Sequence, residues 1–537
     1  MDTQPELDFL PMDEDTKSPA AGSVPWLEIG CAFLTAILFD VAIYHGGGSL
    51  GWAVFFLGAT LLYFVGTLRK RDLINGWLIG AMLVVICLRL IWLNQPGAIF
   101  CGLVLLPALA MCRNGLEPTW WDYAAYGLQS LLSSVFVIRD TGISLQERRG
   151  IKISYIGVLG IALPVGALLI FGTIFVLANP DLATSFSTVF NNIGTWLTDL
   201  LTTTGFGFDD FLILVIIAWL TLGQLVPAMK QNLQELLGFT EGEAKASEEP
   251  EPFALYSPIR NTLIAVVVLF FVYLTYEFCT IPFRQIPPGA YWKYAHQGAA
   301  WLTLALAIAT LMLSAIFRGE LLQDERVEKL KTLAWWWSAA NFILALAVYN
   351  RMFIYVRFNG MTYMRVVGLY GISTVVVGFL LVVWKIRHNQ GFLWLIKRQL
   401  WALSIAIYLL SVTPVDWLVY RWNVWQILSG NPKPAVQITE HEIDLGGWLA
   451  LHDLVDSEDP IIRDGVRAKL AGFYYKGVNS VRPRRMKEAE HWSDYQLVPE
   501  QLKQRLEENK ELWEPFEREG VRDETWYKFK EYAYQWY

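Results

Sequence analysis

The sequence predicts an all-α fold, a polytopic transmembrane helical bundle of about eleven spans followed by a small, mainly helical soluble domain at the C-terminus. Three observations lead to this prediction. Hydrophobic residues make up 54% of the 537 residues and charged residues only 17%, whereas a soluble domain carries about 25% charge. Apolar segments long enough to cross a bilayer recur along the chain. Beyond Arg421 the composition becomes dense in charge.

The expected spans follow from the lengths of the apolar runs, because about 20 residues at 1.5 Å each cover a hydrocarbon core of about 30 Å. Residues 120–138 are interrupted by Asp122, Gln129 and three serines, so this segment either crosses as a twelfth span or lies in the interface as an amphipathic helix. The other spans are 26–44, 50–68, 77–93, 97–112, 153–178, 211–229, 262–279, 298–317, 334–355, 366–384 and 400–420.

Basic residues predict the orientation, since cytoplasmic loops near span ends are enriched in Lys and Arg. Arg69, Lys70 and Arg71 follow the second span, which places that loop and the N-terminus inside. Residues 179–210 contain no Lys or Arg and are expected outside. With eleven spans, the N-terminus is expected to be cytoplasmic and the C-terminus extracytoplasmic. A twelfth span would reverse the side of the C-terminus.

Composition also predicts the domain organisation. The first residues carry six acids against Lys17 alone, as in a disordered tail, and they have neither the basic region nor the short apolar core of a removable signal peptide. A Glu-rich stretch in the middle of the chain is expected to be a flexible linker. The predicted regions are 1–24 (acidic tail), 25–138 (N-terminal membrane helices), 139–238 (central membrane helices), 239–258 (acidic linker), 259–428 (C-terminal membrane helices) and 429–537 (soluble domain).

Within the soluble domain, Ser457 or Asp459 is placed to cap a helix that has Pro460 in its first turn. A second helix is expected over residues 499–512, and aromatic residues gather over residues 532–537. The five cysteines lie in or beside apolar runs without metal-ligand spacing, which favours small core residues over disulfides or metal ligands. These are Cys31, Cys87, Cys101, Cys112 and Cys279.

Ionisable side chains inside spans are costly in lipid, so each is a candidate functional residue. Five of them fall about four residues, or roughly 6 Å, from the outer ends of their helices: Asp40, Arg89, Glu277, Arg351 and Asp416. Among these we expect an ion pair between Asp40 and Arg89 first. Arg351 has the fork geometry to hold a carboxylate or an anionic headgroup. The alternatives are separate side chains that extend to the headgroups and a simple hydrogen bond between helices. The predicted polar cluster comprises Asp40, Arg89, Glu277, Asn341, Asn350, Arg351, Asp416 and Arg421.

Motifs of known chemistry are weak. His45 and the three glycines after it resemble an esterase oxyanion loop, but a short flexible connection between two helices is expected instead. The Glu440-His441-Glu442 stretch, with His452 and Asp453, lacks the spacing of a helix-borne metal site and favours a solvated strand or turn. No phosphate-binding loop occurs, and the net charge of −7 gives no basic excess for nucleic acid. We therefore expect no cofactor, no metal and no nucleic-acid partner.

Several motifs resemble those of a bacterial family of polytopic membrane proteins, described as a domain of unknown function of the "four-one-seven-three" or related "four-one-five-three" kind. The similar segments cover residues 145–454, with Thr413 and Asn359 as departures from the family pattern. The resemblance implies an inner-membrane location and an all-helical fold, without an established activity, cofactor or catalytic residue. The motifs are 349–355 (YNRMFIY), 360–362 (GMT) with Arg365, 294–298 (YAHQG), and 414–416 (PVD) with Arg421 and Asn423.

Three functional interpretations remain open from the sequence, and no recognisable motif favours an enzyme. The first is a membrane scaffold or sensor whose C-terminal domain binds a protein partner through its aromatic end, with the buried charges holding helices together in the lipid bilayer. The second is a transporter or exporter whose polar path is lined by the charges near the outer leaflet. The third is an intramembrane enzyme that acts on lipid-linked substrates. The substrate and the oligomeric state do not follow from the residues.

Overall fold

The structure is a computed structural model of the chain, and the residues that it describes are all in helices, turns or loops. It describes residues 25–67, 74–116, 118–120, 122–123, 126–127, 130, 208–226, 256–280, 306, 326–388, 390–476 and 491–536. Neither the acidic tail nor most of the acidic linker belongs to these residues, and the predicted spans at 153–178 and 298–317 also lie outside them, apart from Leu306.

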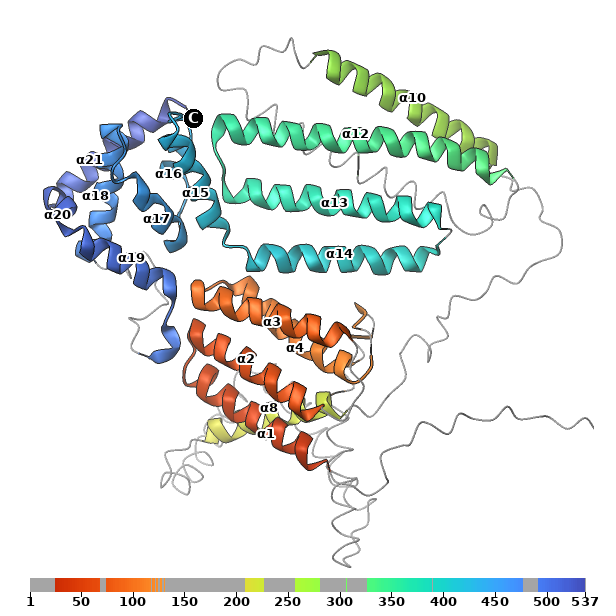
Figure 1. Cartoon of the computed structure of the whole chain (residues 1–537), viewed down its shortest axis with the longest axis horizontal. Helices are drawn as coiled ribbons and strands as arrows, with labels where there is room; N and C mark the ends of the chain where they lie inside the picture. Colours follow the sequence, from red (N-terminus) through yellow and green to blue (C-terminus); the bar gives the residue numbers. More distant parts are fainter. Residues whose placement is uncertain are drawn as a thin grey trace, which may run out of the picture.

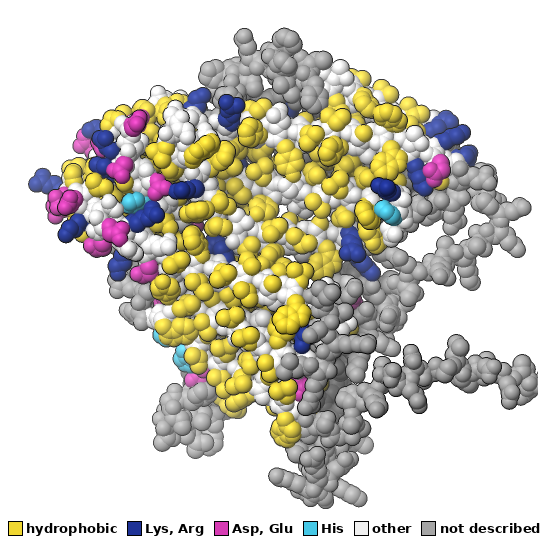
Figure 2. All heavy atoms as spheres, viewed as in Figure 1, with side chains coloured by type: hydrophobic (Ala, Val, Ile, Leu, Met, Phe, Trp, Pro, Cys, Tyr) yellow, Lys and Arg dark blue, Asp and Glu magenta, His cyan; other side chains and the backbone are white. Residues whose placement is uncertain are grey.

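Seven helices in the described part of the chain are long and apolar enough to cross a membrane. Many of their outward side chains are large and apolar, such as Leu78 (61% exposed), Leu88 (62%) and Phe353 (57%). Figure 2 shows hydrophobic side chains over the middle of the molecule, with most of the charged side chains toward its left and right ends. Such a belt suits lipid rather than water as the surrounding solvent. The apolar helices are thus consistent with a membrane location.

The first helical group is built from α1 and four neighbours, which lie side by side in Figure 1. Small buried residues such as Ala32, Ala36 and Ala59 allow the helix backbones to approach closely. Helix α1 passes directly into the π-helical turn η1 (Asp40–Tyr44), which ends the first span. The group comprises α1 (Trp26–Phe39), α2 (Ser49–Gly66), α3 (Ile74–Trp92), α4 (Pro96–Arg113) and α8 (Phe208–Leu225).

The second helical group contains the longest helix of the described chain, α12. Trp337 of α12 and Phe379 of α13 are almost fully buried in its core. Where the groups meet, the Tyr408 hydroxyl of α14 donates to the Met82 carbonyl of α3 at 3.0 Å. The group comprises α10 (Tyr256–Thr280), α12 (Val327–Asn359), α13 (Tyr363–Arg387) and α14 (Phe392–Val412).

The remaining helices form a compact helical domain, which we call the cap (residues 415–476 and 491–536), at one end of both groups (Figure 1). Its core buries aromatic side chains, including Trp513 and Phe529, which have no exposed surface. The cap comprises α15 (Val415–Leu428), α16 (Ala435–Glu440), α17 (Leu445–Leu451), η4 (His452–Leu454), α18 (Pro460–Lys476), η6 (Trp492–Asp494), α19 (Leu497–Glu508), α20 (Lys510–Trp513), η7 (Glu514–Phe516) and α21 (Glu519–Tyr534).

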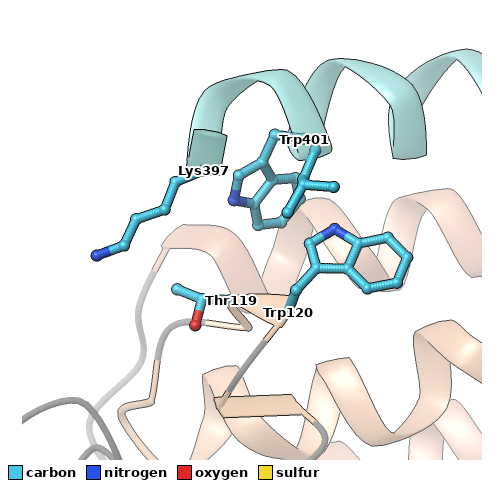
Figure 3. A pocket seen from close by; sticks show the side chains of 5 residues that line it. Thr119, Trp120, Lys397 and Trp401 are labelled. Carbon is cyan, nitrogen blue, oxygen red and sulfur yellow. The ribbon is translucent and has the colours of Figure 1, made fainter. Parts of the chain in front are cut away.

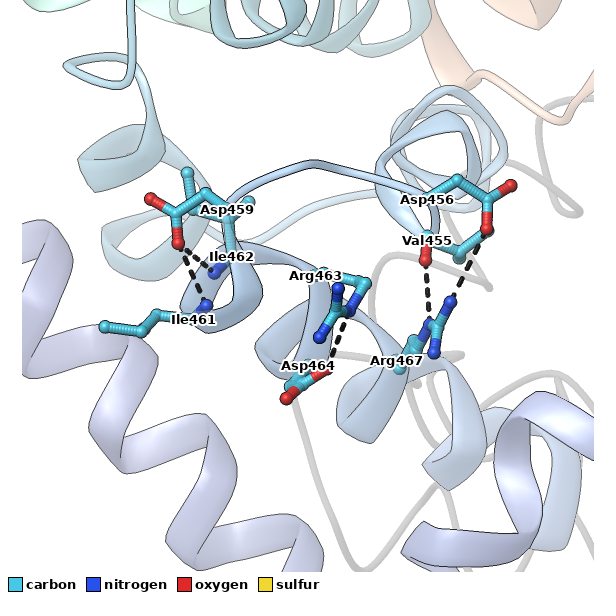
Figure 4. Close-up of polar contacts among 8 residues, drawn as sticks. All are labelled: Val455, Asp456, Asp459, Ile461, Ile462, Arg463, Asp464 and Arg467. Carbon is cyan, nitrogen blue, oxygen red and sulfur yellow. Dashed lines mark hydrogen bonds and ion pairs between the residues drawn. The ribbon is translucent and has the colours of Figure 1, made fainter.

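The cap confirms one predicted helix start and shortens the last predicted span. Asp459 Oδ1 accepts hydrogen bonds from the amides of Ile461 (2.9 Å) and Ile462 (3.3 Å), so Asp459 rather than Ser457 caps α18 (Figure 4). The span predicted at 400–420 is divided at Pro414, because proline has no N–H for the helix ladder and its ring clashes with the preceding turn. Helix α15 therefore begins the cap instead of continuing α14.

Candidate functional site

Several of the polar residues singled out by the sequence meet at the turn between α12 and α13. Gly360 adopts φ +78°, a conformation that L side chains rarely adopt. Buried Arg365 donates to the carbonyls of Asn359, at 2.9 Å, and of Gly360, and its guanidinium carbon lies 3.9 Å from the ring centroid of Tyr355. Thr362 caps α13 by accepting from the Arg365 amide. Arg365 thereby stabilises the turn by satisfying carbonyl groups of the turn itself.

Two amide side chains of the cap form hydrogen bonds to the backbone of this turn. Asn423 of α15 is fully buried; its Oδ1 accepts from the Met361 amide at 2.7 Å and its Nδ2 donates to the Met361 carbonyl at 2.9 Å. Gln437 of α16 donates to the Asn359 carbonyl at 2.7 Å. Gly360, Arg365 and Asn423, which belong to the motifs recognised in the sequence, are therefore parts of one joint between the cap and the second helical group.

A second joint forms where the glycines at 46–48 meet the cap segment η6. The Ser493 hydroxyl donates to the Gly46 carbonyl at 2.7 Å. A Cβ on Gly48 would lie 2.3 Å from the Ser493 carbonyl oxygen and 2.5 Å from an Asp494 carboxylate oxygen. The glycines lie in the expected short connection between the end of α1 and α2, and they also leave the space in which the cap backbone approaches the first helical group.

A third joint lies at the turn between α3 and α4. The Asn94 amide donates to Gln496 Oε1 of the cap at 3.0 Å, and Leu93 is buried in the same apolar cluster as the cap core. Arg89, 7% exposed, donates to the Leu93 carbonyl and to Gln95 Oε1. This arginine thus closes the end of α3 on which the cap rests.

The expected ion pair between Asp40 and Arg89 is not formed. Arg89 instead lies in the electrostatic field of two cap carboxylates, Asp416 and Asp444, and Asp416 Oδ2 accepts from the Asp444 amide at 3.3 Å. Burial, followed by repulsion from Asp444, raises the pKa of Asp416 to about 6, and burial also raises the pKa of Asp444. Sequence spacing placed Asp40 and Arg89 at a similar depth, but depth alone does not bring two helix faces together.

Asp40 meets a different pair of residues at the end of α1. His45 Nδ1 lies 3.6 Å from Asp40 Oδ2, and His45 Nε2 lies 3.3 Å from Asp210 Oδ1 of α8. Ligand atoms of these three side chains all lie within 4.8 Å of one another, a spacing at which they could hold a metal ion. Nothing in the sequence spacing linked Asp210 to Asp40, and His45 was set aside with the glycines that follow it.

The other predicted residues do not join one cluster. Asn341 is fully buried in α12 and donates to the Trp337 carbonyl at 2.9 Å. Arg351 is 7% exposed, whereas Asn350 beside it is exposed. Glu277 belongs to α10, and its side chain lies outside the described residues. The remaining candidate, Arg421, is an exposed cap residue that forms an ion pair with Asp453.

A small pocket lies away from these joints, at the end of α14 that is remote from the cap. Figure 3 shows the indoles of Trp120 and Trp401 close together in this pocket, with Lys397 and Thr119 beside them. Two indoles and a lysine form an arrangement typical of a membrane interface. None of the predicted polar residues lines this pocket, so it is separate from the cap joints.

The comparisons with known proteins place the chain in a family without assigning it an activity. No curated protein and no solved structure matches the chain significantly. The family described as "Domain of unknown function (DUF4153)" matches residues 33–444, which run from the middle of α1 through the second helical group to the first part of the cap. The matched range also contains the Gly360, Arg365 and Asn423 joint and confirms the resemblance seen in the sequence. The chain therefore belongs to the DUF4153 family.

Proposed function

We propose that this protein is a membrane-embedded scaffold or sensor in which the cap couples the two helical groups and binds a partner protein. One observation carries the proposal: cap residues hydrogen-bond to turns of both helical groups. Ser493 and Gln496 hold the first group, while Asn423 and Gln437 hold the second. A domain attached to both groups changes its own contacts whenever one group moves against the other.

The use made of the buried arginines supports a scaffold over a transporter. Arg89 and Arg365 direct their donors to backbone carbonyls of their own turns. Donors engaged in this way stabilise the turn and are occupied, whereas a polar path requires groups that face water or substrate. Reaction of Asn350→Cys and Asp416→Cys with a membrane-impermeant thiol reagent, prevented by a transported substrate, would favour the transporter instead.

The cap also offers aromatic side chains suited to a protein partner. Helix α21 buries Phe529 and Ala533 in the core and leaves Val521 (40%), Tyr527 (61%) and Tyr534 (45%) exposed. Tyrosine is enriched in protein interfaces because it contributes a large apolar area at a low cost in side-chain entropy. We therefore place the partner site on the exposed side of α21.

The orientation forms part of the same proposal. The cap rests on the turns at 46–48, 93–95 and 360–362, which are the connections that the distribution of Lys and Arg assigns to the extracytoplasmic side. We infer a bacterial inner-membrane protein with an extracytoplasmic cap. Protease added outside sealed spheroplasts should cleave the cap; complete protection, with cleavage only in inverted vesicles, would reverse the orientation.

The coupling is tested at Gly48. Gly48→Ala places a Cβ against Ser493 and Asp494, whereas Gly30→Ala in α1 meets nothing within 4 Å and is the matched control. We expect Gly48→Ala to increase amide hydrogen exchange in η6 and α19, with Gly30→Ala unchanged from the wild type. Unchanged exchange in both variants would show that this joint does not couple the cap to the first helical group.

The partner is tested at Tyr527. A photoreactive amino acid at position 527 should form a discrete adduct in cells, and the same amino acid at exposed Gln504 on α19 should not form it. Gly48→Ala should alter the yield of that adduct if the cap reports the state of the membrane helices. Identical labelling at both positions would argue against a partner site on α21.

A further inference from the structure

The residues Asp40, His45 and Asp210 form a mixed nitrogen and oxygen cluster where α1 ends. The three side chains come from the π-helical turn, the residue that follows it, and α8. His45 Nε2 lies 3.3 Å from Asp210 Oδ1. Two ligands about 2.0–2.1 Å from a tetrahedral Zn²⁺ are themselves about 3.3–3.4 Å apart, so this pair already has the separation of two ligands of one ion.

The π-helical turn explains how Asp40 and His45 come to the same side. The His45 amide donates to the Asp40 carbonyl at 3.0 Å, which is the i→i+5 bond of a π-helix. In an α-helix residues five apart are turned about 140° from one another, whereas the wider turn brings them together. Such turns occur frequently at functional sites.

The surroundings of the imidazole suit a metal ligand. His45 Nδ1 lies 3.3 Å from the Asp40 carbonyl oxygen, which can accept a hydrogen bond from the tautomer that carries its hydrogen on Nδ1. In that tautomer the lone pair is on Nε2, which faces Asp210. A hydrogen bond from the second ring nitrogen to a carbonyl or carboxylate is the usual support of a metal-bound histidine.

The burial and the chemistry of the three side chains suit a metal ion. The side chains of Asp40 and Asp210 are 6% and 8% exposed, while that of His45 is 53% exposed. Carboxylates and imidazoles are the oxygen and nitrogen ligands that zinc-class ions accept, and the exposed imidazole gives an ion access from solvent.

From these observations we propose that Asp40, His45 and Asp210 bind one divalent transition-metal ion of the zinc class. Imidazole selects such ions over Mg²⁺ and Ca²⁺, and the two carboxylates complete three protein ligands. A water molecule would take the fourth position. Bound metal would tie α1 to α8 immediately beside Gly46, which holds Ser493 of the cap.

The test uses the full-length protein in detergent, purified through a tag without histidine and stripped with a chelator. Titration with Zn²⁺ should give one equivalent bound per chain. His45→Ala and Asp210→Asn should each weaken binding by at least about 10-fold, by comparison with the 10–100-fold cost of losing even an outer-shell partner. The control is His388→Ala, which removes an exposed histidine at the end of α13 that is remote from the cap.

A second measurement does not depend on the variants folding. Co²⁺ added to the stripped wild-type protein should give the visible absorption bands of a four-coordinate site, and one equivalent of Zn²⁺ should abolish them. Zn²⁺ affinity unchanged in His45→Ala and Asp210→Asn would overturn the proposal, as would the absence of Co²⁺ bands.

Discussion

Removal of the Asn423 side chain should loosen the joint between the cap and the second helical group. Asn423 makes two hydrogen bonds to the backbone of Met361, at 2.7 and 2.9 Å, from a fully buried position. Asn423→Ala leaves one N–H and one C=O without these partners. At about 1–3 kcal/mol for each unsatisfied group, and with Met361 only partly buried, we expect a loss of about 2–4 kcal/mol.

The assay is denaturant unfolding of the full chain in a fixed detergent, with amide hydrogen exchange to locate the change. Gln504→Ala on the exposed side of α19 is the control, with an expected change within about 0.5 kcal/mol. The Met361 amide should exchange faster in Asn423→Ala than in the wild type. If the unfolding free energy of Asn423→Ala equals that of the control and the Met361 amide stays protected from exchange, this side chain does not hold the joint.

Three further predictions concern charged groups. The pKa of Asp416 is raised to about 6 in the folded protein, against about 4 in an unfolded chain. Between these two pH values the folded state therefore binds more protons than the unfolded state. The stability that Asp416 contributes is full below about pH 4 and is lost as the pH rises through about 6. Asp416→Asn should flatten the pH profile of the unfolding midpoint, and an unchanged slope would contradict the assignment. Asp40→Asn and Arg89→Gln should affect the unfolding free energy additively within about 0.5 kcal/mol, because they form no ion pair; a coupling well above that value would restore the pair. Arg365→Lys should cost about 1–3 kcal/mol in the same unfolding assay, since lysine keeps the charge but cannot fork between two carbonyls while it stacks on Tyr355. Wild-type stability of Arg365→Lys would show that charge alone suffices.

The helical fold could be predicted because its signals are local. The apolar runs at 50–68 and 366–384 match α2 (Ser49–Gly66) and α13 (Tyr363–Arg387) closely. Asp459 was a cap candidate since a helix start needs a side-chain acceptor within two or three residues. The end of the last span was misplaced because the apolar composition continues beyond Pro414 although the helix axis does not.

The candidate site could be predicted only in part. Buried Asp40 and Arg89 were singled out, as were Arg365 and Asn423, because charged or motif residues in apolar surroundings stand out in a sequence. Their partners could not be named in advance. The glycines at 46–48 stand out in the sequence, but only the close approach of Ser493, 447 residues after Gly46, explains why side chains are absent there.

The amino-acid sequence by itself determined the helical class of the elements and the apolar character that is consistent with a membrane location. Hydrophobic content, run length and low charge are properties of short segments, and a helix that meets lipid must satisfy its backbone internally whatever its neighbours are. The tertiary structure alone decided which polar groups meet. His45 faces both Asp40 and Asp210, and Arg89 faces the cap. These contacts depend on how helices rotate and pack against one another, which the periodicity of a single helix does not encode.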